Sequence, residues 1–486
     1  MVSEKAIDSL RELLGNQNFT NSISAKNFFS KDLFYEGLQP LAIISPTNIN
    51  DLRKCIIICK EGNLEIIPRG GGLSYTAGYL KIKKNNKNFI LFDMRKINRI
   101  IEINTENLTA TVEPGCTWED LYIQTSKSGL RPKMFGPSTG KFSTIGGSVT
   151  NNCMFFGSAS AGTSSDSVLG LDIMSSNGEI IKTGSGSIKN GKAFYRNNGP
   201  DITGVFLNDG GIMGIKIKIT LLLEQIPKGE KHLSLSFDSI HPLIEAIINI
   251  GRSNLTSECI AIIPSILGDE SKKIKPSLHI VTEGWSKSIA EIKYQAILEM
   301  VETISEVSQI DPIIPKYFRE KMFDFVESPL DSNGKLQIWT HGVFPFDQIE
   351  ISYKTIRDII LNYKNIIKAE EISVTMSFAL AGNAVMIEPV ITWTGNASEL
   401  HLLGMKNNAK HQEIKANQLN ASTKPLVHEI RNAIEKGMSE LGAAHMQYGR
   451  FYKFAHNNSQ SSVEFIKSIK TIVDPSRLFN PGALDI

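Results

Sequence analysis

The sequence predicts an α+β protein built from two or three packed units. The first observation is the length of 486 residues with 41% hydrophobic side chains, which is enough for more than one substantial core. The second is that segments with helical periodicity alternate with β-branched runs along the chain. The third is that, after about residue 225, helices and strands follow the order typical of a domain with a mainly antiparallel sheet.

The N-terminal half begins with a helix and continues mostly as strands. Residues 48–62 have apolar side chains at helical spacing and precede a short strand at 65–68. Further strands are predicted at 88–93, 97–103, 108–112, 168–174 and 215–223, and a further helix at 118–128. Residues 136–165 are almost all small and polar, too long a stretch for a plain connection, so we expect backbone to approach a ligand there.

The C-terminal half alternates helices with strands. Helices are predicted at 241–251, 287–306, 350–361 and 425–441, and strands at 233–237, 259–263, 278–282, 336–341 and 384–393. The chain ends on a helix at 462–472 and the turn-rich segment 474–482. This order predicts a second domain of the α+β class.

Charge and cysteine content exclude several partners and compartments. The 52 Lys and Arg residues nearly balance the 50 Asp and Glu residues, so the net charge of +2 gives no basic field for nucleic acid. The five cysteines form no CxxC pair, and an odd, scattered set is typical of a reducing compartment. The start shows no signal-peptide pattern, and no apolar run approaches the roughly 18 residues of a membrane span. We therefore expect a cytoplasmic protein with no transmembrane segment, free or peripheral at a membrane.

A glycine-rich loop follows the strand at 65–68. The segment Pro68-Arg-Gly-Gly-Gly-Leu-Ser74 presents consecutive backbone N–H groups that no side chain shields, with an arginine beside them. This combination suits a pyrophosphate group. A glycine hairpin that binds nothing fits the loop equally well when it is taken alone.

Two further glycine-rich segments favour a long ligand. One is residues 143–152, and its hydrogen-bonding or small residues are Thr144, Gly146, Gly147, Asn151 and Asn152. The other is residues 210–215. Three such loops on one sheet domain fit a ligand with a diphosphate in its middle, and FAD meets that description. No GxGxxG follows a strand, and Phe142 stands where a Walker loop needs Ser or Thr, so neither a Rossmann nor an ATP site is indicated.

Six motifs occur in a recognisable order. They are Pro68–Ser74, Val112–Leu121, Pro137–Gly147, Asp166–Leu171, Gly211–Ile215 and Asp474–Gly482. In order and spacing they resemble the vanillyl-alcohol oxidase/p-cresol methylhydroxylase (PCMH-type) flavoprotein family. The resemblance implies a two-subdomain FAD-binding domain at 1–224, an antiparallel-sheet cap domain for the substrate at 225–441, and a segment at 442–486 that returns to the FAD domain.

The same resemblance implies contacts with FAD at individual positions. The pyrophosphate is expected at Pro68, Arg69, Gly70, Gly71, Gly72, Leu73 and Ser74. The middle of the cofactor is expected at Ser138, Thr144, Gly146, Gly147 and Asn152, with Pro137 and Asn151 beside them. Gly211 and Ile215 are expected near the adenine end, and Asn480 near the flavin ring.

Departures from the family pattern limit the cofactor chemistry. Family members with a histidyl flavin link have His where Leu73 stands, and those with a second, cysteinyl link have Cys where Phe142 and Ser143 stand, so we expect non-covalent FAD. Residues 386–393 and 442–450 resemble the D-lactate or glycolate dehydrogenase branch. Metal-using members of that branch carry a His-rich stretch and a Glu that are replaced here by 378–385 and Ala444, so no metal is expected.

Oxidation of an alcohol next to a carboxylate needs a cation, a base and a hydride acceptor. Our candidates are His445 as the base, Tyr448 to orient the substrate and Arg450 as the carboxylate partner. Contact with FAD or a surface acid fits Arg450 equally well, and a structural role for His445 stays open. Glu388 lies in an apolar strand where burial would raise its pKa, and the preferred interpretation is a salt bridge to a cap lysine.

The sequence therefore predicts an FAD-dependent oxidoreductase that acts on the CH–OH group of a small 2-hydroxy acid resembling D-lactate or glycolate. A separate electron acceptor is expected, which is oxygen, a quinone or a carrier protein. One alternative is an oxidase or dehydrogenase of a phenolic or sugar alcohol on the same fold. The other is a non-catalytic flavin-binding protein. The stereochemistry of the substrate, the acceptor and the oligomeric state, including a homodimer, stay open.

Overall fold

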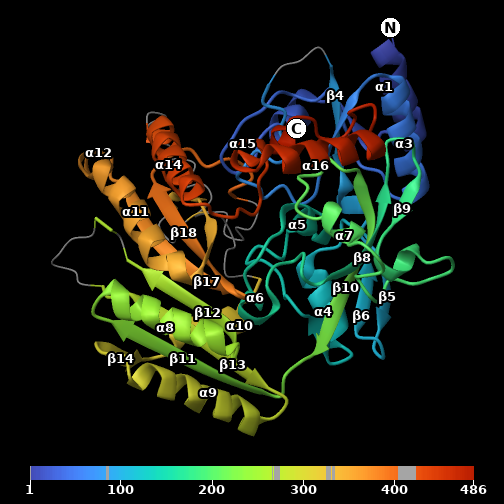
Figure 1. Cartoon of the computed structure of the whole chain (residues 1–486). Helices are drawn as coiled ribbons and strands as arrows, with labels where there is room; N and C mark the ends of the chain where they lie inside the picture. Colours follow the sequence, from blue (N-terminus) through green and yellow to red (C-terminus); the bar gives the residue numbers. More distant parts are fainter. Residues whose placement is uncertain are drawn as a thin grey trace. The chain divides into compact units, whose positions relative to one another are not determined.

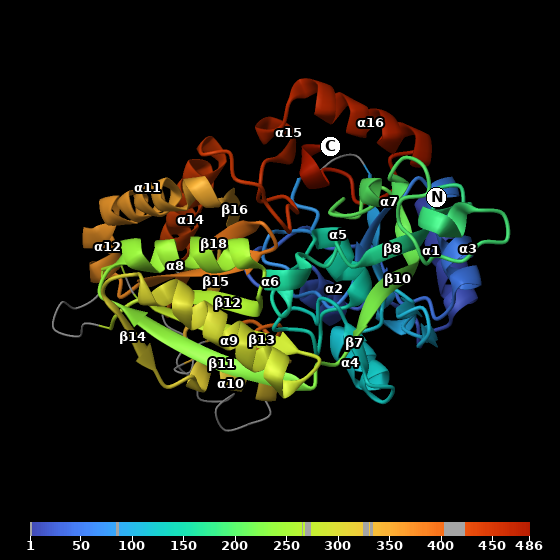
Figure 2. The same cartoon turned by 60° about the horizontal axis from the view of Figure 1, so that its bottom comes forward.

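The computed structural model describes residues 2–83, 87–264, 266–267, 274–323, 330, 334–402 and 423–486. The chain divides into two compact units, which Figures 1 and 2 show from two directions. Unit 1 consists of Met1–Cys153, Ser164–Gln225 and Met446–Ile486, and unit 2 of Met154–Thr163 and Ile226–His445. No helix in the described ranges is both long and apolar enough to cross a membrane.

Unit 1 contains a four-stranded sheet in the order β1-β2-β4-β3. Its strands are β1 (Phe19–Thr20), β2 (Ala42–Ile44), β3 (Glu65–Arg69) and β4 (Phe89–Asp93), with helices α1 (Val2–Leu14), α2 (Ile23–Phe29) and α3 (Ile49–Glu61). β2, β4 and β3 are parallel to one another, and every residue of β4 is buried. A strand covered on both faces has an unbroken apolar sequence, which explains Phe-Ile-Leu-Phe at its start.

The end of the chain completes this sheet beside β3. The N–H of Ile66 donates to Leu478 O at 2.8 Å, and the N–H of Asn480 donates back to Ile66 O at 2.8 Å. Asp474 holds the turn before them, because its carboxylate accepts from the N–H of Leu478 at 2.9 Å and pairs with the buried Lys470. The helices before this turn are α15 (Phe454–Asn457) and α16 (Gln460–Val473).

A second sheet of unit 1 has six antiparallel strands in the order β5-β6-β10-β8-β9, with β7 paired to the end of β10. They are β5 (Ile100–Asn104), β6 (Thr109–Val112), β7 (Leu130–Pro132), β8 (Val168–Met174), β9 (Ile180–Lys182) and β10 (Ile215–Gln225). Three helices accompany it: α4 (Trp118–Ser126), α5 (Ile145–Asn151) and α7 (Ile202–Val205). The small-residue stretch 136–165 thus contains α5 rather than loop alone.

Unit 2 is built on an eight-stranded sheet in the order β14-β11-β13-β12-β17-β18-β15, with β16 paired to β18. All pairings are antiparallel. The strands are β11 (Gly229–Phe237), β12 (Thr256–Ile263), β13 (Ser277–Gly284), β14 (Val307–Ile310), β15 (Leu336–Trp339), β16 (Gly342–Pro345), β17 (Ser373–Ala381) and β18 (Ala384–Trp393). The predicted α+β architecture with an antiparallel sheet in the second half is confirmed.

Helices of unit 2 pack on this sheet, and α8, α9 and α11 can be followed across the strands in Figure 2. The helices are α6 (Ser158–Ala161), α8 (Ile240–Ser253), α9 (Lys287–Glu302), α10 (Ile313–Glu320), α11 (Ile349–Asn362), α12 (Lys364–Ala369) and α14 (Thr423–Glu440). α6 lies in residues 154–163, which belong to unit 2 although the residues on either side belong to unit 1. In this segment the N–H of Gly157 donates to the buried Glu258 at 2.7 Å.

The two faces of the unit 2 sheet differ in polarity. Alternate residues of β17 and β18, such as Phe378 and Ile387, are buried and apolar, and Tyr353 of α11 packs against Phe378. The intervening positions form the other face, and in register there lie Ser377 and Glu388. Polar side chains therefore collect on the sheet face opposite α11. We call this the polar face of unit 2.

Candidate functional site

The first two glycine-rich loops meet in unit 1. A Cβ atom on Gly70 would lie 2.2 Å from Thr144 Oγ1, and one on Gly71 would lie 2.1 Å from Phe142 O. Real side chains cannot approach so closely, so glycine is required at both positions. The segments around residues 70 and 144 are far apart in sequence, and the fold places them side by side.

The first loop has backbone donors without protein acceptors. Within the described ranges, the N–H groups of residues 71–74 make no hydrogen bond, and Gly72 has a positive φ of 78°. In contrast, the N–H of Gly146 donates to Pro114 O at 2.9 Å, and that of Gly147 to Thr144 Oγ1 at 3.3 Å. Consecutive unpaired N–H groups form an anion-binding concavity. An anion is therefore expected at the first loop rather than at the start of α5.

Arg69 lies beneath this loop in an aromatic cage. Its guanidinium carbon is 4.7 Å from the ring centroid of Phe29, 5.1 Å from Tyr79 and 5.7 Å from Phe28. The residue is 2% exposed, its Nε has no partner, and no carboxylate of the described chain pairs with it. A Cβ on Gly72 would lie 1.9 Å from the guanidinium, so the cation lies directly against the loop. A buried cation without a carboxylate is costly unless a ligand supplies the negative charge.

Asn480 connects the third glycine-rich segment to the residues that follow the first loop. Its side-chain N–H₂ donates to Gly78 O at 2.8 Å and to Gly210 O at 2.6 Å. Its Oδ1 accepts from Arg450 at 2.8 Å, and the same guanidinium donates to Ala77 O, Gly78 O and Pro481 O. These contacts occupy four of the five donors of Arg450.

The other predicted cofactor residues also lie in unit 1. Pro68 is in β3, Pro137 and Ser138 lie in the loop before α5, Thr144 caps α5, and Asn151 and Asn152 end it. Gly211 comes within reach of Pro68, since its Cβ would be 3.4 Å from Pro68 Cγ, whereas Ile215 is buried in the core. The unpaired N–H groups, the caged cation and the glycine contacts fit the pyrophosphate of FAD. Residues 69–74 would hold that group when the cofactor is bound.

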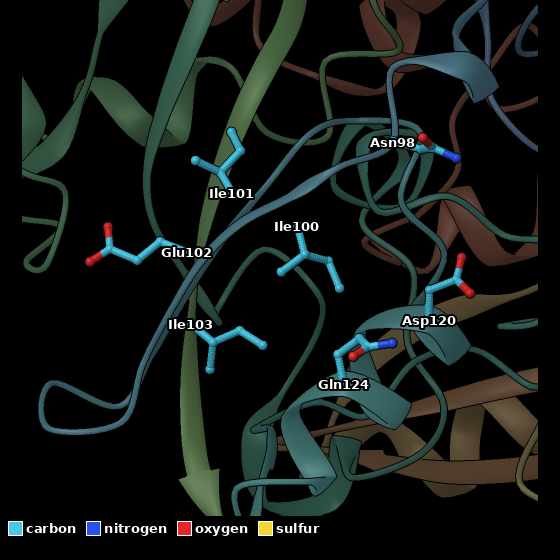
Figure 3. Close-up of a pocket in the computed structure, with 7 residues that line it drawn as sticks. All are labelled: Asn98, Ile100, Ile101, Glu102, Ile103, Asp120 and Gln124. Atoms are coloured by element: carbon cyan, nitrogen blue, oxygen red, sulfur yellow. The ribbon is translucent and has the colours of Figure 1, made fainter.

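A surface hollow of about 590 Å³ lies elsewhere in unit 1 (Figure 3). It is lined by Asn98, Ile100, Ile101, Glu102, Ile103, Asp120 and Gln124. Figure 3 shows Ile100 and Ile103 pointing from β5 toward α4, which carries Asp120 and Gln124. None of these residues belongs to the loops with unpaired N–H groups. This hollow is therefore not the candidate cofactor site.

The three predicted catalytic residues divide between the units. His445 belongs to unit 2, whereas Tyr448 and Arg450 belong to unit 1. His445 Nδ1 donates to His341 O at 2.9 Å, and its Nε2 lies 3.2 Å from Ser439 Oγ. Burial lowers the pKa of His445 to about 4, so the ring is neutral at pH 7 and is a weak base. The ring of Tyr448 packs edge-on against Phe454 at 5.2 Å.

Glu388 is a carboxylic acid on the polar face of unit 2. Its Oε2 accepts a long hydrogen bond of 3.4 Å from the hydroxyl of Ser377, its register partner. The expected salt bridge to a cap lysine is absent among the described residues. Burial raises the pKa of Glu388 to about 7, and the Ser377 hydroxyl opposes this rise. A carboxylate that titrates near neutrality can accept a proton from a substrate hydroxyl.

Comparison with known proteins now adds to this geometry. Residues 40–184 match the family model described as FAD binding domain. The chain is similar to glycolate oxidase subunit GlcD of Bacillus subtilis, at 24% identity over 100% of this chain and 97% of that protein. It is also similar to the mitochondrial D-lactate dehydrogenase (cytochrome) of Kluyveromyces lactis, at 24% identity over 99% and 81%. The solved structure of p-cresol methylhydroxylase with substrate bound has a TM-score of 0.74 at 16% identity, covering 100% of this chain and 97% of that one.

The chain is an FAD-dependent oxidoreductase. Its resemblance to the PCMH-type flavoproteins is confirmed, because the matched residues 40–184, except for 154–163, lie in unit 1 and the fold is shared along the whole chain. The predicted glycine loops at 68–74 and 136–147 lie within the matched range. The third loop and Asn480 of this oxidoreductase lie outside it.

Unit 2 of the oxidoreductase should lose stability in mild acid. His279 is buried between Ser234 and Ser277, and burial lowers its pKa to about 4. The unfolded residue binds a proton near pH 6.5 and the folded one does not, so this contribution falls as pH drops from about 6.5 toward 4. The unfolding free energy of the wild type should drop between pH 6.5 and pH 5, and in His279→Gln this drop should be smaller by about 2 kcal/mol. Urea unfolding at both pH values measures the drop in each protein. The exposed His456→Gln is the control, and an equal effect of both variants would contradict the prediction.

Proposed function

We propose that the protein oxidises a small 2-hydroxy acid, of the size of D-lactate or glycolate, at its CH–OH carbon. The observation that carries the proposal is the similarity over nearly the whole chain to a glycolate oxidase subunit and a D-lactate dehydrogenase. FAD, when bound, supplies hydride acceptance for such a reaction. The unit boundaries at Gln225 and His445 lie near the predicted ends at 224 and 441, and we assign FAD binding to unit 1 and the group that accepts the substrate proton to unit 2.

Glu388 is the base that we propose for the hydroxyl proton. Its pKa near 7 leaves a large fraction ionised at neutral pH, and no cation of the described chain neutralises it. His445 is less suited, because its pKa is about 4 and its Nδ1 is committed to His341 O. We retain His445 as a neutral side chain whose Nε2 can accept a hydrogen bond.

Arg450 is proposed to position the FAD loops rather than to bind the substrate carboxylate. Four of its donors go to acceptors at residues 77, 78, 480 and 481, which leaves Nε alone for a ligand. Burial also lowers its pKa to about 10, well above neutrality, so the guanidinium stays charged. Tyr448 remains our candidate for orienting the substrate.

The proposal is tested by anaerobic reduction of the bound flavin. Glycolate and both enantiomers of lactate should bleach the flavin absorbance, and p-cresol and sugar alcohols should not. Acid precipitation of the same preparation should release the flavin into the supernatant, because Leu73 offers no atom for a covalent link. Bleaching by a phenol alone would favour the phenolic alternative. Bound flavin that no substrate reduces would favour the non-catalytic one.

The cellular setting is a proposal of the same kind. We propose a cytoplasmic location and electron transfer to a separate acceptor, such as oxygen, a quinone or a carrier protein. The relative from Kluyveromyces lactis is a mitochondrial protein, so the compartment of that relative differs. The nature of the acceptor decides whether the protein needs a surface that reaches a membrane.

A further inference from the structure

One segment of unit 1 projects from the second sheet as a closed loop. It joins β9 to α7 at residues 183–201, and both Figures 1 and 2 show this green segment reaching outward beside β8 and β9. We call it the β9–α7 loop. Ser185 closes it, because its N–H donates to Tyr195 O at 2.7 Å and its hydroxyl donates to Lys192 O at 2.7 Å. The same hydroxyl accepts from the N–H of Phe194 at 2.9 Å. The loop therefore has a fixed backbone.

Both ends of the β9–α7 loop are also held by contacts with the rest of unit 1. Arg196 donates to Ser165 O at 2.9 Å and pairs with Asp201 at 2.9 Å. At the opposite end, Gly184 has a positive φ of 60°, and a Cβ there would lie 2.3 Å from Leu169 O of β8. Since both ends are tied to the sheet, the side chains at the loop's tip are held in position by the fold.

These side chains are large, apolar and exposed. On the loop, Phe194 is 60% exposed, Tyr195 57% and Ile188 50%, and Ile202 at the start of α7 is 45% exposed. No ring contact forms on Phe194 or Tyr195 in the described part of the chain. Exposed apolar residues that occur singly need no explanation, but a group of them on one ordered loop marks an interaction site.

The charge of the segment is distinct from that of the whole chain. Residues 180–202 contain four cations, Lys182, Lys189, Lys192 and Arg196, and one carboxylate, Asp201. The segment thus carries +3, whereas the remainder of the chain sums to −1, given the total of +2. Lys182 and Lys189 are exposed, and Lys192 is exposed while it contacts Glu102 at 3.1 Å. The apolar side chains therefore lie in a segment whose net charge of +3 exceeds that of the whole chain.

We propose that the β9–α7 loop seats the protein on an anionic lipid surface. Aromatic and aliphatic side chains with lysines beside them are the combination that enters the headgroup region of a bilayer. The lysines would attract anionic headgroups, and Phe194, Tyr195 and Ile188 would enter the interface. The apolar side chains project outward, and a fluid bilayer accepts projecting side chains without a matching pocket, which a protein partner would have to provide. The inference is independent of the substrate.

The test is sedimentation of the purified holoprotein with vesicles. We expect little binding to phosphatidylcholine alone, strong binding when phosphatidylglycerol is added, and loss of that binding at high salt. The double substitution Phe194→Ser with Tyr195→Ser should weaken binding to the mixed vesicles at least about tenfold. Lys182→Gln with Lys189→Gln should remove most of the preference for phosphatidylglycerol. Flavin absorbance of each variant verifies that it is folded.

The matched control is Phe465→Ser on α16, since Phe465 is 65% exposed in the same unit. It should bind vesicles as the wild type does. Equal binding of wild type and the Phe194/Tyr195 variant, or no dependence on phosphatidylglycerol, would overturn the proposal. A concentration-dependent dimer that the Phe194/Tyr195 variant abolishes would assign the loop to a second copy of the chain and would also overturn it.

Discussion

Glu388→Gln is expected to produce a more stable but nearly inactive protein. The pKa of Glu388 is raised to about 7 in the folded state from an ordinary value of 4.5. A raised pKa means that the stabilising contribution is present below pH 4.5 and is lost as pH rises through 7. The neutral amide avoids that loss, so the free energy of unfolding at pH 8 should rise by about 1 to 3 kcal/mol. Urea unfolding at pH 8 and pH 4.5 measures the difference, which should vanish at the lower pH.

The activity of Glu388→Gln should fall although its stability rises. If Glu388 accepts the hydroxyl proton, its loss should lower kcat by about 10²-fold or more. Wild-type kcat/KM should rise with pH through a step near pH 7, and the variant should lack that step. Stopped-flow reduction of the flavin by the best substrate gives both values. Retained activity together with increased stability would show that Glu388 lowers the stability of the fold without taking part in catalysis.

Glu258→Gln is the matched control for this experiment. Glu258 also lies on the unit 2 sheet and is buried, but Arg319 lies 3.0 Å from its Oε1 and Gly157 donates to the same atom. Removing its charge takes away one of three carboxylate partners of Arg319, which keeps Glu230 and Glu283, so the variant should be destabilised by about 1 kcal/mol or more. A gain in unfolding free energy for Glu388→Gln and a loss for Glu258→Gln would show that the stability change depends on whether the glutamate has a cationic partner.

Arg69→Met is expected to weaken FAD binding without weakening the protein that lacks FAD. The side chain is buried, caged by three rings and placed against Gly72, and no carboxylate of the described chain compensates its charge. The pyrophosphate would be its counter-charge, so the dissociation constant of FAD should rise by about tenfold to a hundredfold. Flavin fluorescence after dilution measures this release. The unfolding midpoint of the flavin-free protein should stay level or rise.

Two further variants define what Arg69 contributes. Arg69→Lys keeps the charge and should recover part of the FAD affinity. Arg99→Met removes an arginine that is 73% exposed and paired with Glu113, and FAD affinity should not change. Unchanged FAD affinity in Arg69→Met would refute the proposed role of the cation. Loss of stability in the flavin-free protein would instead assign Arg69 to the packing of Phe28, Phe29 and Tyr79.

Local sequence determined many of the elements and their approximate limits, although it did not predict α1, α2 or β17. The helix predicted at 425–441 is Thr423–Glu440, and the strand predicted at 384–393 is Ala384–Trp393. Both follow from patterns that a single segment contains, namely apolar spacing and β-branched residues. The glycine loops could also be located, because consecutive glycines after a strand are visible without any partner. The motif at 474–482 marked the closing segment for the same reason.

Contacts between distant segments could not be obtained from those patterns. The cage of Arg69 includes Phe28 and Phe29 of α2, whose sequence gives no sign that they meet a cation. The four acceptors of Arg450 come from residues 77, 78, 480 and 481, so the preferred partner of this guanidinium depends on how the chain end returns to β3. A motif specifies which residues are present but not which donors are already occupied.

The sequence by itself therefore determined the fold class and the positions of the glycine-rich loops. The tertiary structure decided which groups remain able to act. Strand register pairs Glu388 with Ser377 and gives it no cation, and the resulting desolvation moves its pKa to about 7. Burial shifts the pKa of His445 in the opposite direction, to about 4, and its hydrogen bond to His341 O only partly opposes that shift. Protonation and donor occupancy depend on neighbours that are distant in sequence, and only the folded chain brings those neighbours together.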